Sequence, residues 1–418
     1  MNKMTLSEEL TWRGQIKDKT FKDVTWLDQP KTFYLGSDCS SDSLQAGNLA
    51  IYMMARRLRK HGWKAVMLVG GATSLIGDPG GKDEERQLKS REEIQANVAG
   101  IKKQINCLFS GMDFELVDNY DWFKDMGYLE FLRNVGKQYS MTELLQRDFI
   151  ASRIGDGGSG ISYAEFSYSL IQGYDYWHLY KKHDVCLQLG GSDQWGNMLS
   201  GVPLIRKKEN VEVHALSMPL VINKATGKKF GKSEDGAIWL DPTKTSPTQF
   251  YQFWINAEDD SVEDYLKVYT ELDKEDIDKL MHHHKEAPQM RTAQTRLAQE
   301  VTKLVHGQED MKRAEKVTEL LTGKAHLSDA GAATLAIMRQ EQPSLVTTTT
   351  GSVVEALVSS GLASSNTEAR RLLAGNAVTI NSVKVTREAF EAADFVNGHL
   401  LLRKGKKFKD SALVELKS

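Results

Sequence analysis

Five short segments combine glycines, acids, amides and lysines in patterns that could bind a ligand or stabilise a reaction. They are YLGSDCSSDSLQAGNL (34–49), GGATSLIGDPGGK (70–82), YSLIQGYDYW (168–177), LGGSDQWGN (189–197) and ATGKKFGKSEDG (225–236). Three of them follow a predicted strand, and ligands bind at the carboxyl ends of the strands in a parallel sheet. A helix that begins near Leu44 would offer free N–H groups to a phosphate. Taken alone, the segments that follow a strand are also typical of ordinary capped turns.

The charged groups beside these turns indicate what a ligand would carry. Asp78 could bind an ammonium group, and Lys82 and Arg86 beyond it could meet phosphate. Asp193 stands at a strand end, where a carboxylate can bind ribose hydroxyls. The glycine pattern GxGxxG is absent, so a dinucleotide site is not expected.

Residues 168–177 suit a pocket for a small polar aromatic molecule. If this segment is helical, Tyr168, Gln172 and Asp175 fall at i, i+4 and i+7, which is one face. Two hydrogen-bonding groups and a carboxylate would then project together among aromatic residues. An amphipathic helix with a solvated edge would show the same spacing, so this pattern needs support from the other segments.

The lysines of residues 225–236 are interleaved with glycines, which is typical of a basic loop that closes on a leaving polyphosphate. The Walker pattern GxxxxGK[ST] does not fit this loop, and a solvated basic turn would look the same. Three adjacent histidines, His282 to His284, would point in different directions on a helix. We therefore expect no metal site there.

The composition sets wider limits. The 418 residues are enough for two or three domains, and 40% hydrophobic with 26% charged residues is ordinary for a folded soluble protein. No apolar run is long enough to span a membrane, and residues 1–10 show no signal peptide. The dispersed Cys39, Cys107 and Cys186 exclude a disulfide framework and favour a reducing, cytoplasmic compartment. A net charge of -2 gives no overall signal for nucleic acid.

Up to about residue 220, short apolar strands alternate with helices. Strands are predicted at 31–37, 64–70, 114–118 and 184–189. One helix is predicted over 44–61, and Gly62 can stop it. Another begins at Ser90, which forms a capping box with Glu93, and ends at Gly111. This alternation predicts a doubly wound parallel α/β sheet.

From about Pro247 the pattern changes, and residues 248–322 are predicted to form successive helices. The stretch PSLVTTTTG (343–351) looks like a linker. After it we expect a small separate unit with helices at 352–360 and 366–374, a hairpin about Asn381–Ser382 and a strand at 399–405.

Together the five segments resemble the bacterial tyrosyl-tRNA synthetases. The order, spacing and residue types of the motifs agree, from YxGxDxxxDSL through GGATxLIGDP, QGYD and GGSDQWGN to KFGKS. QGYD followed by GGSDQWGN is a specific combination, and the resemblance covers essentially the whole chain. In the tail, the stretch SGLASSNTEARRLLAGNAVTINSVKV is similar to the small S-four RNA-binding domain.

The resemblance implies a class I aminoacyl-tRNA synthetase with a defined domain order. The expected parts are a Rossmann-like catalytic domain (1–222) with a connecting insertion (about 112–165) that forms a dimer interface, a lysine loop of the KMSKS type with a linker (223–247), an α-helical anticodon-binding domain (248–325), a second linker (326–350) and a small α+β S-four-type RNA-binding domain (351–418).

The same resemblance implies which residues bind tyrosine. Tyr34 and Asp175 would hydrogen-bond its phenolic hydroxyl, which argues against a tryptophan-specific relative. Asp38 would contact the substrate end of the pocket. The ammonium group would be held by Asp78, Tyr168 and Gln172.

The resemblance also implies contacts with ATP. The ribose and the activated carboxyl region would meet Gly191, Asp193 and Gln194. Close backbone approach would be allowed by Gly36 and Gly47. Lys229 and Lys232 occupy the two lysine positions of the KMSKS-type loop. Lys82 and Arg86 match positions that the family uses near pyrophosphate or the acceptor end.

One motif departs from the family. The HIGH tetrad reads Gln45-Ala46-Gly47-Asn48, so both histidines are replaced. The family's imidazoles donate hydrogen bonds to ATP, and glutamine and asparagine are neutral donors of similar reach. We interpret QAGN as a functional replacement; the alternative is that ATP use is weakened or lost. With Gln45 and Asn48, the loop lysines and Ser40 would stabilise charge that develops on the phosphates.

The expected activity is tyrosine–tRNA ligation, with L-tyrosine, magnesium-bound ATP and tRNA(Tyr) as substrates, no protein-bound metal or organic cofactor, a homodimeric state and no membrane contact. Basic tail residues would meet the RNA backbone: Arg370, Arg371, Arg403, Lys404, Lys406, Lys407 and Lys409. The competing class is a non-catalytic RNA-binding protein on the same scaffold. The altered HIGH motif favours that class, whereas the intact KFGKS loop and tyrosine pocket oppose it.

Overall fold

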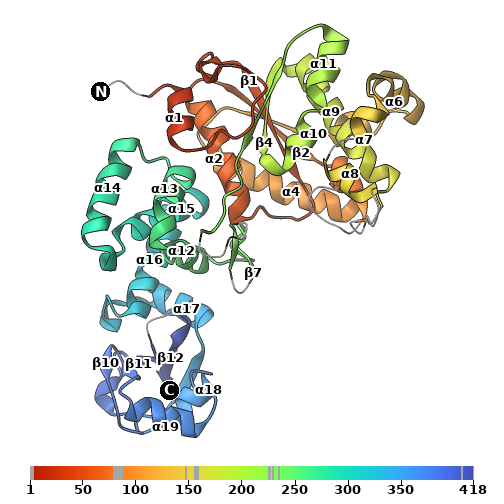
Figure 1. Cartoon of the computed structure of the whole chain (residues 1–418). Coiled ribbons are helices and arrows are strands. Elements are labelled where there is room, and N and C mark those ends of the chain that lie inside the picture. Colours follow the sequence, from red (N-terminus) through yellow and green to blue (C-terminus); the bar gives the residue numbers. More distant parts are fainter. Residues whose placement is uncertain are drawn as a thin grey trace. The chain divides into compact units, whose positions relative to one another are not determined.

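A computed structural model describes residues 4–78, 88–145, 148–154, 160–224, 227, 230–233, 236–405 and 408–417. The chain forms two compact units. The first contains Met1–Lys244 and Glu258–Lys285, and the second contains Thr245–Ala257 and Glu286–Ser418. Figure 1 labels their helices and strands.

The first unit is built on a five-stranded parallel sheet in the order β3-β2-β1-β4-β5. Its strands are β1 (Thr32–Asp38), β2 (Lys64–Gly70), β3 (Glu115–Asp118), β4 (Val185–Gly191) and β5 (His214–Met218). The predicted doubly wound sheet is confirmed, with one strand, β5, that the sequence reasoning did not identify. The chain runs outward from β1 to β3 and then returns to β4 on the other side of β1. The strand order therefore reverses between β1 and β4, which is where such sheets bind ligands.

Helices connect these strands, and their ends follow local capping signals. The main ones are α2 (Ala46–Lys60), α4 (Arg91–Leu108), α9 (Tyr163–His183) and α11 (Gly201–Glu209). Ser90 caps α4 by accepting a hydrogen bond from the Glu93 backbone N–H at 3.1 Å, which is one half of the predicted capping box, while the Glu93 carboxylate pairs with Lys89. Asp184 ends α9 in the left-handed conformation. The helix predicted for the QGYD segment is thus present as the middle of α9.

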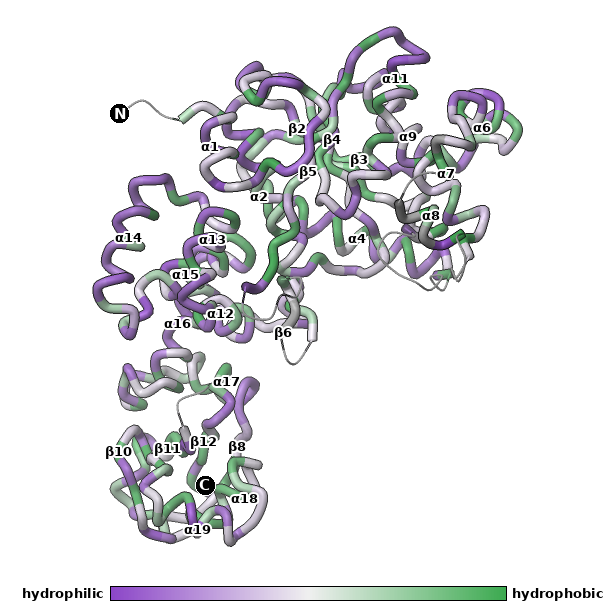
Figure 2. Tube along the Cα trace, viewed as in Figure 1, coloured by the Kyte–Doolittle hydropathy of each residue, from purple (hydrophilic) through white to green (hydrophobic). Residues whose placement is uncertain are grey.

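Short helices fill the segment between β3 and α9, where the connecting insertion is predicted. They are α5 (Tyr120–Phe123), α6 (Tyr128–Asn134), α7 (Met141–Leu145) and α8 (Asp148–Ile154). The remaining elements of the first unit are α1 (Leu6–Trp12), α3 (Thr73–Ile76), α10 (Trp195–Met198), α13 (Asp259–Tyr269), α14 (Lys274–Glu286), β6 (Lys232–Ser233) and β7 (Gly236–Ala237). In Figure 2, α14 is coloured mainly as hydrophilic, and its buried residues, Ile277, Met281 and His284, follow the spacing of one helix face.

The second unit begins with helices that pack against one another, α12 (Pro247–Ile255), α15 (Thr292–His306) and α16 (Gln308–Thr322). The helices predicted over 248–322 are present. They divide between the two units, since α13 and α14 belong to the first.

The rest of the second unit is a small α+β domain. Its sheet has the order β10-β9-β11-β12-β8. The elements are α17 (Ala332–Glu341), β8 (Ser344–Thr347), α18 (Val353–Ser359), α19 (Asn366–Ala374), β9 (Thr379–Ile380), β10 (Val383–Lys384), β11 (His399–Arg403) and β12 (Ser411–Leu416). The predicted helices and hairpin are confirmed. Asn381 and Ser382 both have positive φ, 48° and 73°, as a two-residue hairpin turn of this hand requires.

Residues 326–350 differ from the predicted linker. They contain α17 and β8, and β8 pairs in parallel with β12 from Leu413↔Ser344 to Leu416↔Thr347. The segment SLVT gives a weak sequence signal because only its Leu and Val are apolar, and neither is fully buried. Its pairing partner, β12, lies about 70 residues further along the chain, so local pattern could not indicate it.

Among the described residues, no helix is long and apolar enough to cross a membrane. In the same part of the chain, no group of three or more His, Cys, Asp or Glu side chains is placed to hold a metal ion.

Candidate active site

The predicted tyrosine and ATP residues gather where the strand order reverses. Gly36 and Asp38 lie at the carboxyl end of β1, and Gly191 ends the neighbouring β4. The helix α2 begins a few residues after β1, so its first N–H groups belong to the same edge of the sheet. The fold therefore joins segments that are more than 150 residues apart in sequence.

Asp175 has a buried carboxylate that accepts two hydrogen bonds. It is 2% exposed, and it accepts hydrogen bonds from Asn119 Nδ2 at 3.1 Å and from Trp122 Nε1 at 2.9 Å. Burial raises the pKa of Asp175 to about 7, against the lowering effect of these two hydrogen bonds. Neither Asn119 nor Trp122 was singled out from the sequence, because both lie in the weakly patterned segment after β3.

Tyr34 lies close enough to Asp175 for the two to interact electrostatically. Its ring is 1% exposed, and its hydroxyl has no hydrogen-bond partner among the residues that the structure describes. Burial, with a contribution from Asp175, raises the pKa of Tyr34 well above its ordinary value, so the hydroxyl stays a donor at neutral pH. A buried hydroxyl without a partner is costly, and a ligand hydroxyl would satisfy it.

Asp78 is held in a cluster of amides. Its carboxylate accepts a hydrogen bond from Gln194 Nε2 at 2.6 Å and another from Asn197 Nδ2 at 3.3 Å. Asn197 also donates to Gln194 Oε1 at 3.2 Å. The structure thus joins Asp78, which the resemblance assigns to the ammonium group of tyrosine, and Gln194, which it assigns to the ribose and the activated carboxyl region. Asn197 ends the quoted GGSDQWGN motif but was not proposed as a site residue.

Two further residues of the predicted tyrosine site lie on α9. Tyr168 is 7% exposed and contributes to the electrostatic environment of Tyr34, and Gln172 is half-buried. Gln172 and Asp175 therefore come from the same helix, as the i, i+4, i+7 spacing predicts.

The turn after β1 is fixed by hydrogen bonds of its own. Asp38 Oδ1 accepts from Ser74 Oγ at 2.8 Å and from the Ser40 backbone N–H at 3.1 Å. Ser74 in turn accepts from the Cys39 backbone N–H at 2.8 Å. Asp38 remains exposed. Ser74, within the GGATSLIGDP motif, supports this turn.

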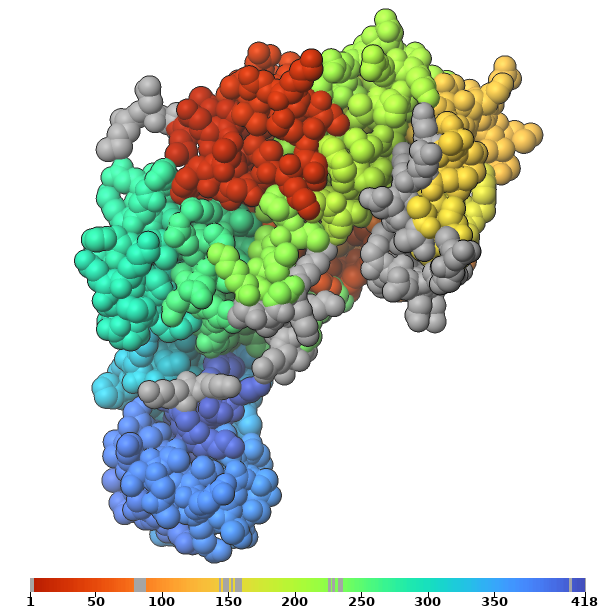
Figure 3. All heavy atoms as spheres, viewed as in Figure 1, coloured from red at the N-terminus to blue at the C-terminus, as the bar shows by residue number. Residues whose placement is uncertain are grey.

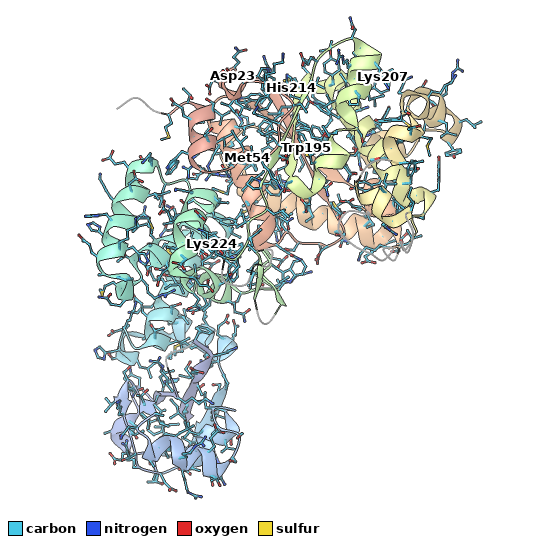
Figure 4. The ribbon with its side chains drawn as sticks, in the orientation of Figure 1. Asp23, Met54, Trp195, Lys207, His214 and Lys224 are labelled. Atoms are coloured by element: carbon cyan, nitrogen blue, oxygen red, sulfur yellow. The ribbon has the colours of Figure 1, made fainter. Side chains whose placement is uncertain are left out.

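At the end of β4, a Cβ atom on Gly191 would lie 2.5 Å from Asp193 Oδ1, so a larger residue there would displace this carboxylate. Asp193 itself is exposed, as a ribose ligand would need. Trp195, labelled in Figure 4, begins α10 directly after Gln194.

At the start of α2, the replaced HIGH residues form a helix cap. The Gln45 backbone N–H donates to Asn48 Oδ1 at 3.0 Å, and the Ala46 N–H donates to Ile238 O at 2.8 Å. Gln45 is half-buried and Asn48 is exposed. The side-chain oxygen of Asn48 therefore serves the helix, while its NH₂ group is the chemical donor that could meet a phosphate.

Gly47 lies against the backbone of Phe230, which belongs to the KFGKS motif. A Cβ atom on Gly47 would lie 2.8 Å from the carbonyl oxygen of Phe230, closer than real Cβ atoms approach. We expect Gly47→Ala to displace one of the two backbones at a cost of about 1–3 kcal/mol. The turnover number for ATP-dependent activation of tyrosine should then fall about tenfold or more. Steady-state kinetics with varied ATP tests this, with Gly331→Ala as the control, because its Cβ would meet no atom within 4 Å.

Several predicted residues lie outside what the structure describes. Lys82, Arg86, Lys229, Lys406 and Lys407 are outside the described residues, and for Lys232 only the backbone in β6 is described. Their roles stay predictions.

The predicted RNA-binding residues of the tail differ in how exposed their side chains are. Arg370 and Arg371 are exposed on α19, and Arg370 pairs with Glu388 at 3.2 Å. Lys404 is half-buried. Arg403 is only 6% exposed and donates to Gly405 O at 3.1 Å. Arg403 therefore supports the domain from within, and its position does not fit the predicted contact with RNA.

Comparison with known proteins identifies the family of this chain. The family model described as tRNA synthetases class I (W and Y) matches residues 28–322, and the chain belongs to this family. A second model, the SYY-like C-terminal domain of tyrosine–tRNA ligase, matches residues 335–409. Within the family, the chain is similar to curated proteins that carry the name tyrosine–tRNA ligase.

Two such relatives are bacterial. The protein from Flavobacterium psychrophilum is 42% identical, over 96% of this chain and 97% of its own length. That from Latilactobacillus sakei is 41% identical, again over 96% of this chain and 97% of its own. Among solved structures, a C-terminally truncated mitochondrial tyrosyl-tRNA synthetase from Aspergillus nidulans is 30% identical with a TM-score of 0.68. It covers 75% of this chain and 93% of its own.

Proposed function

We propose that this chain is a tyrosine–tRNA ligase. It activates L-tyrosine with ATP to tyrosyl-adenylate and pyrophosphate, and it then transfers tyrosine to the 3′ end of tRNA(Tyr). The observation that carries this proposal is the buried Tyr34 hydroxyl, which lacks a partner among the described residues, beside the buried Asp175 carboxylate. A phenolic hydroxyl can accept from the first and donate to the second, and phenylalanine would leave both without that partner.

The first step needs no protein nucleophile, because the carboxylate of tyrosine attacks the α-phosphate of ATP. The protein then contributes position and charge stabilisation. Asp78, with the amides of Gln194 and Asn197, supports the ammonium group of tyrosine. Gln45 at the start of α2 and Lys232 in β6 would stabilise the negative charge that develops on the ATP phosphates.

Magnesium enters with ATP, as part of the substrate. Its usual ligands are phosphate oxygens and water, so the chain needs no dedicated metal cage. The α+β domain of the second unit would contact the tRNA backbone through exposed Arg370 and Arg371. The cytoplasmic location remains a prediction from the sequence.

We also propose a homodimer formed through the insertion between β3 and α9. Large apolar side chains are exposed there, Tyr128 (61%), Leu129 (78%) and Met141 (55%), and Tyr163 at the start of α9 is 62% exposed. In Figure 3 the atoms of this insertion, in the yellow range of the colour bar, lie open on the face in view. Several exposed apolar side chains in one segment, with the Tyr128 and Tyr163 hydroxyls 3.3 Å apart, support a protein–protein interface.

The charge-introducing change Leu129→Glu should convert the dimer to a monomer at micromolar concentration, because it would bury a carboxylate in an apolar contact. Light scattering coupled to size-exclusion chromatography measures the mass. Val346→Glu is the matched control, since Val346 is 69% exposed and lies outside the insertion. A Leu129→Glu protein that keeps the dimeric mass would refute this interface.

The experiment for the proposed function is the exchange of labelled pyrophosphate into ATP. We expect exchange with L-tyrosine and none above background with phenylalanine or tryptophan. Exchange would also establish that Gln45 and Asn48 replace the two family histidines. A folded sample that binds tRNA without tyrosine-dependent exchange would support the non-catalytic RNA-binding class instead.

A further inference from the structure

Phe230, in the middle of the KFGKS motif, packs against two tyrosines of α13. Its ring centroid is 4.5 Å from that of Tyr265 and 5.4 Å from that of Tyr269, with interplanar angles of 43° and 38°. The two tyrosines lie four residues apart on one face of the helix and are 2% and 0% exposed. Aromatic pairs at such distances contribute about 0.5–1.5 kcal/mol beyond the area they bury.

The backbone at Phe230 and Gly231 is fixed by two hydrogen bonds and lies close to the start of α2. The Phe230 N–H donates to Val221 O at 2.9 Å, and the Ile238 N–H donates to Gly231 O at 3.1 Å. Gly231 has φ +105°, and a Cβ atom there would lie 2.7 Å from the Gly47 backbone nitrogen. The segment Phe230–Gly231 thus lies in direct contact with the start of α2, and its conformation requires glycine.

The end of α13 is hydrogen-bonded to α2 and to Arg13, the residue that follows α1. Arg57 of α2 donates to Lys267 O at 3.1 Å and to Thr270 O at 2.6 Å. Arg13 donates to Lys267 O at 2.7 Å and to Leu272 O at 2.7 Å. The start of α2 therefore contacts the backbone of Phe230 and Gly231, and Arg57 near its other end is hydrogen-bonded to α13. The ring of Phe230 in turn packs against α13, so it connects the two helices.

We propose that Phe230 is a positioning residue for tyrosine activation, anchored by Tyr265 and Tyr269 so that the backbone leading to Lys232 is held against the start of α2. The proposal rests on the proposed function. Lys232 is two residues from Phe230, so a shift of the anchored backbone moves the lysine with respect to α2. A displacement of about 1 Å can lower a rate by about a hundredfold. The tyrosine pocket, built from β1, β4 and α9, does not depend on this anchor.

The test is Phe230→Leu, studied by rapid-quench formation of tyrosyl-adenylate and by pyrophosphate exchange in the full chain. We expect the rate constant of activation to fall at least tenfold, with the KM for tyrosine unchanged within about twofold. Phe230→Tyr, which keeps the ring, should retain most of the wild-type rate. Tyr265→Leu should lower the rate in the same way, and the double variant Phe230→Leu/Tyr265→Leu should cost no more than the larger single change, because both act through one contact.

The matched control is Phe395→Leu, which makes the same change in a half-buried aromatic pair of the second unit, where the ring centroids of Phe390 and Phe395 are 5.8 Å apart. It should leave exchange unchanged. The proposal is overturned if Phe230→Leu keeps the wild-type activation rate, if the KM for tyrosine changes as much as that rate, or if the two single effects simply add. Absence of exchange in the wild-type chain would contradict the proposed function itself, so the two failures are distinguishable.

Discussion

Asp175→Ala is expected to lower kcat/KM for tyrosine about ten- to a hundredfold. The change removes a charged acceptor from the phenolic hydroxyl, which is worth about 1.5–3 kcal/mol, and a factor of ten corresponds to about 1.4 kcal/mol. Asn119 and Trp122 also lose their present acceptor, but that cost is the same in the free enzyme and in the tyrosine complex, so it lowers stability rather than kcat/KM. Pyrophosphate exchange with varied tyrosine measures the effect.

Tyr34→Phe is the matched comparison within the same pocket. It removes a hydroxyl that has no partner among the described residues, so the fold should lose little stability. Use of tyrosine should fall by about tenfold, while use of phenylalanine should change little. If Asp175→Ala and Tyr34→Phe both leave tyrosine kinetics unchanged, the phenol-binding assignment is wrong.

The pH dependence of tyrosine use should follow the carboxyl of Asp175. Burial raises its pKa to about 7, so the carboxylate takes up a proton as the pH falls through that value, and the phenolic hydroxyl loses its charged acceptor. The KM for tyrosine should therefore rise about tenfold between pH 8 and pH 6. Because the folded pKa is raised above the ordinary 3.8, the contribution of this group to stability is present below about pH 4 and is lost as the pH rises to about 7.

The second large effect is expected for Arg57→Ala, through stability. Arg57 is 3% exposed, and burial lowers its pKa well below the ordinary value. Its guanidinium donates to the carbonyls of Lys267, Val268 and Thr270, the last at 2.6 Å. Removing it leaves the carbonyls of Val268 and Thr270 without this donor, at about 1–3 kcal/mol each, whereas Lys267 O and Glu9 keep their contacts with Arg13.

A urea titration followed by circular dichroism tests this, read on the transition of the first unit. Arg59→Ala, two residues further along α2, is the control. Arg59 pairs with the fully exposed Asp113 at 3.4 Å, and exposed pairs contribute about 0–1 kcal/mol. Equal shifts in the two variants would show that the contacts of Arg57 with α13 do not stabilise the unit.

Much of this protein follows from local sequence. Alternating apolar strands and helices predict the parallel sheet, because side-chain periodicity and capping act within a few residues. Ser90 starts α4, and Asn381–Ser382 turns the hairpin, as their types predict. The spacing of Gln172 and Asp175 places both on one side of a helix that the structure contains. The motifs and their order also predict the family, to which the chain belongs.

Other features depend on contacts between residues that are far apart in sequence. Asp78 meets Gln194 across 116 positions, because the turns after β2 and β4 lie at one edge of the sheet. Burial of Arg403, although its sequence context looks basic and exposed, depends on the packing of the small domain. The contact of Phe230 with Gly47 needs the frame of α2 and α13. Periodicity predicts that a side chain is buried, but only the register of distant elements decides what lies against it.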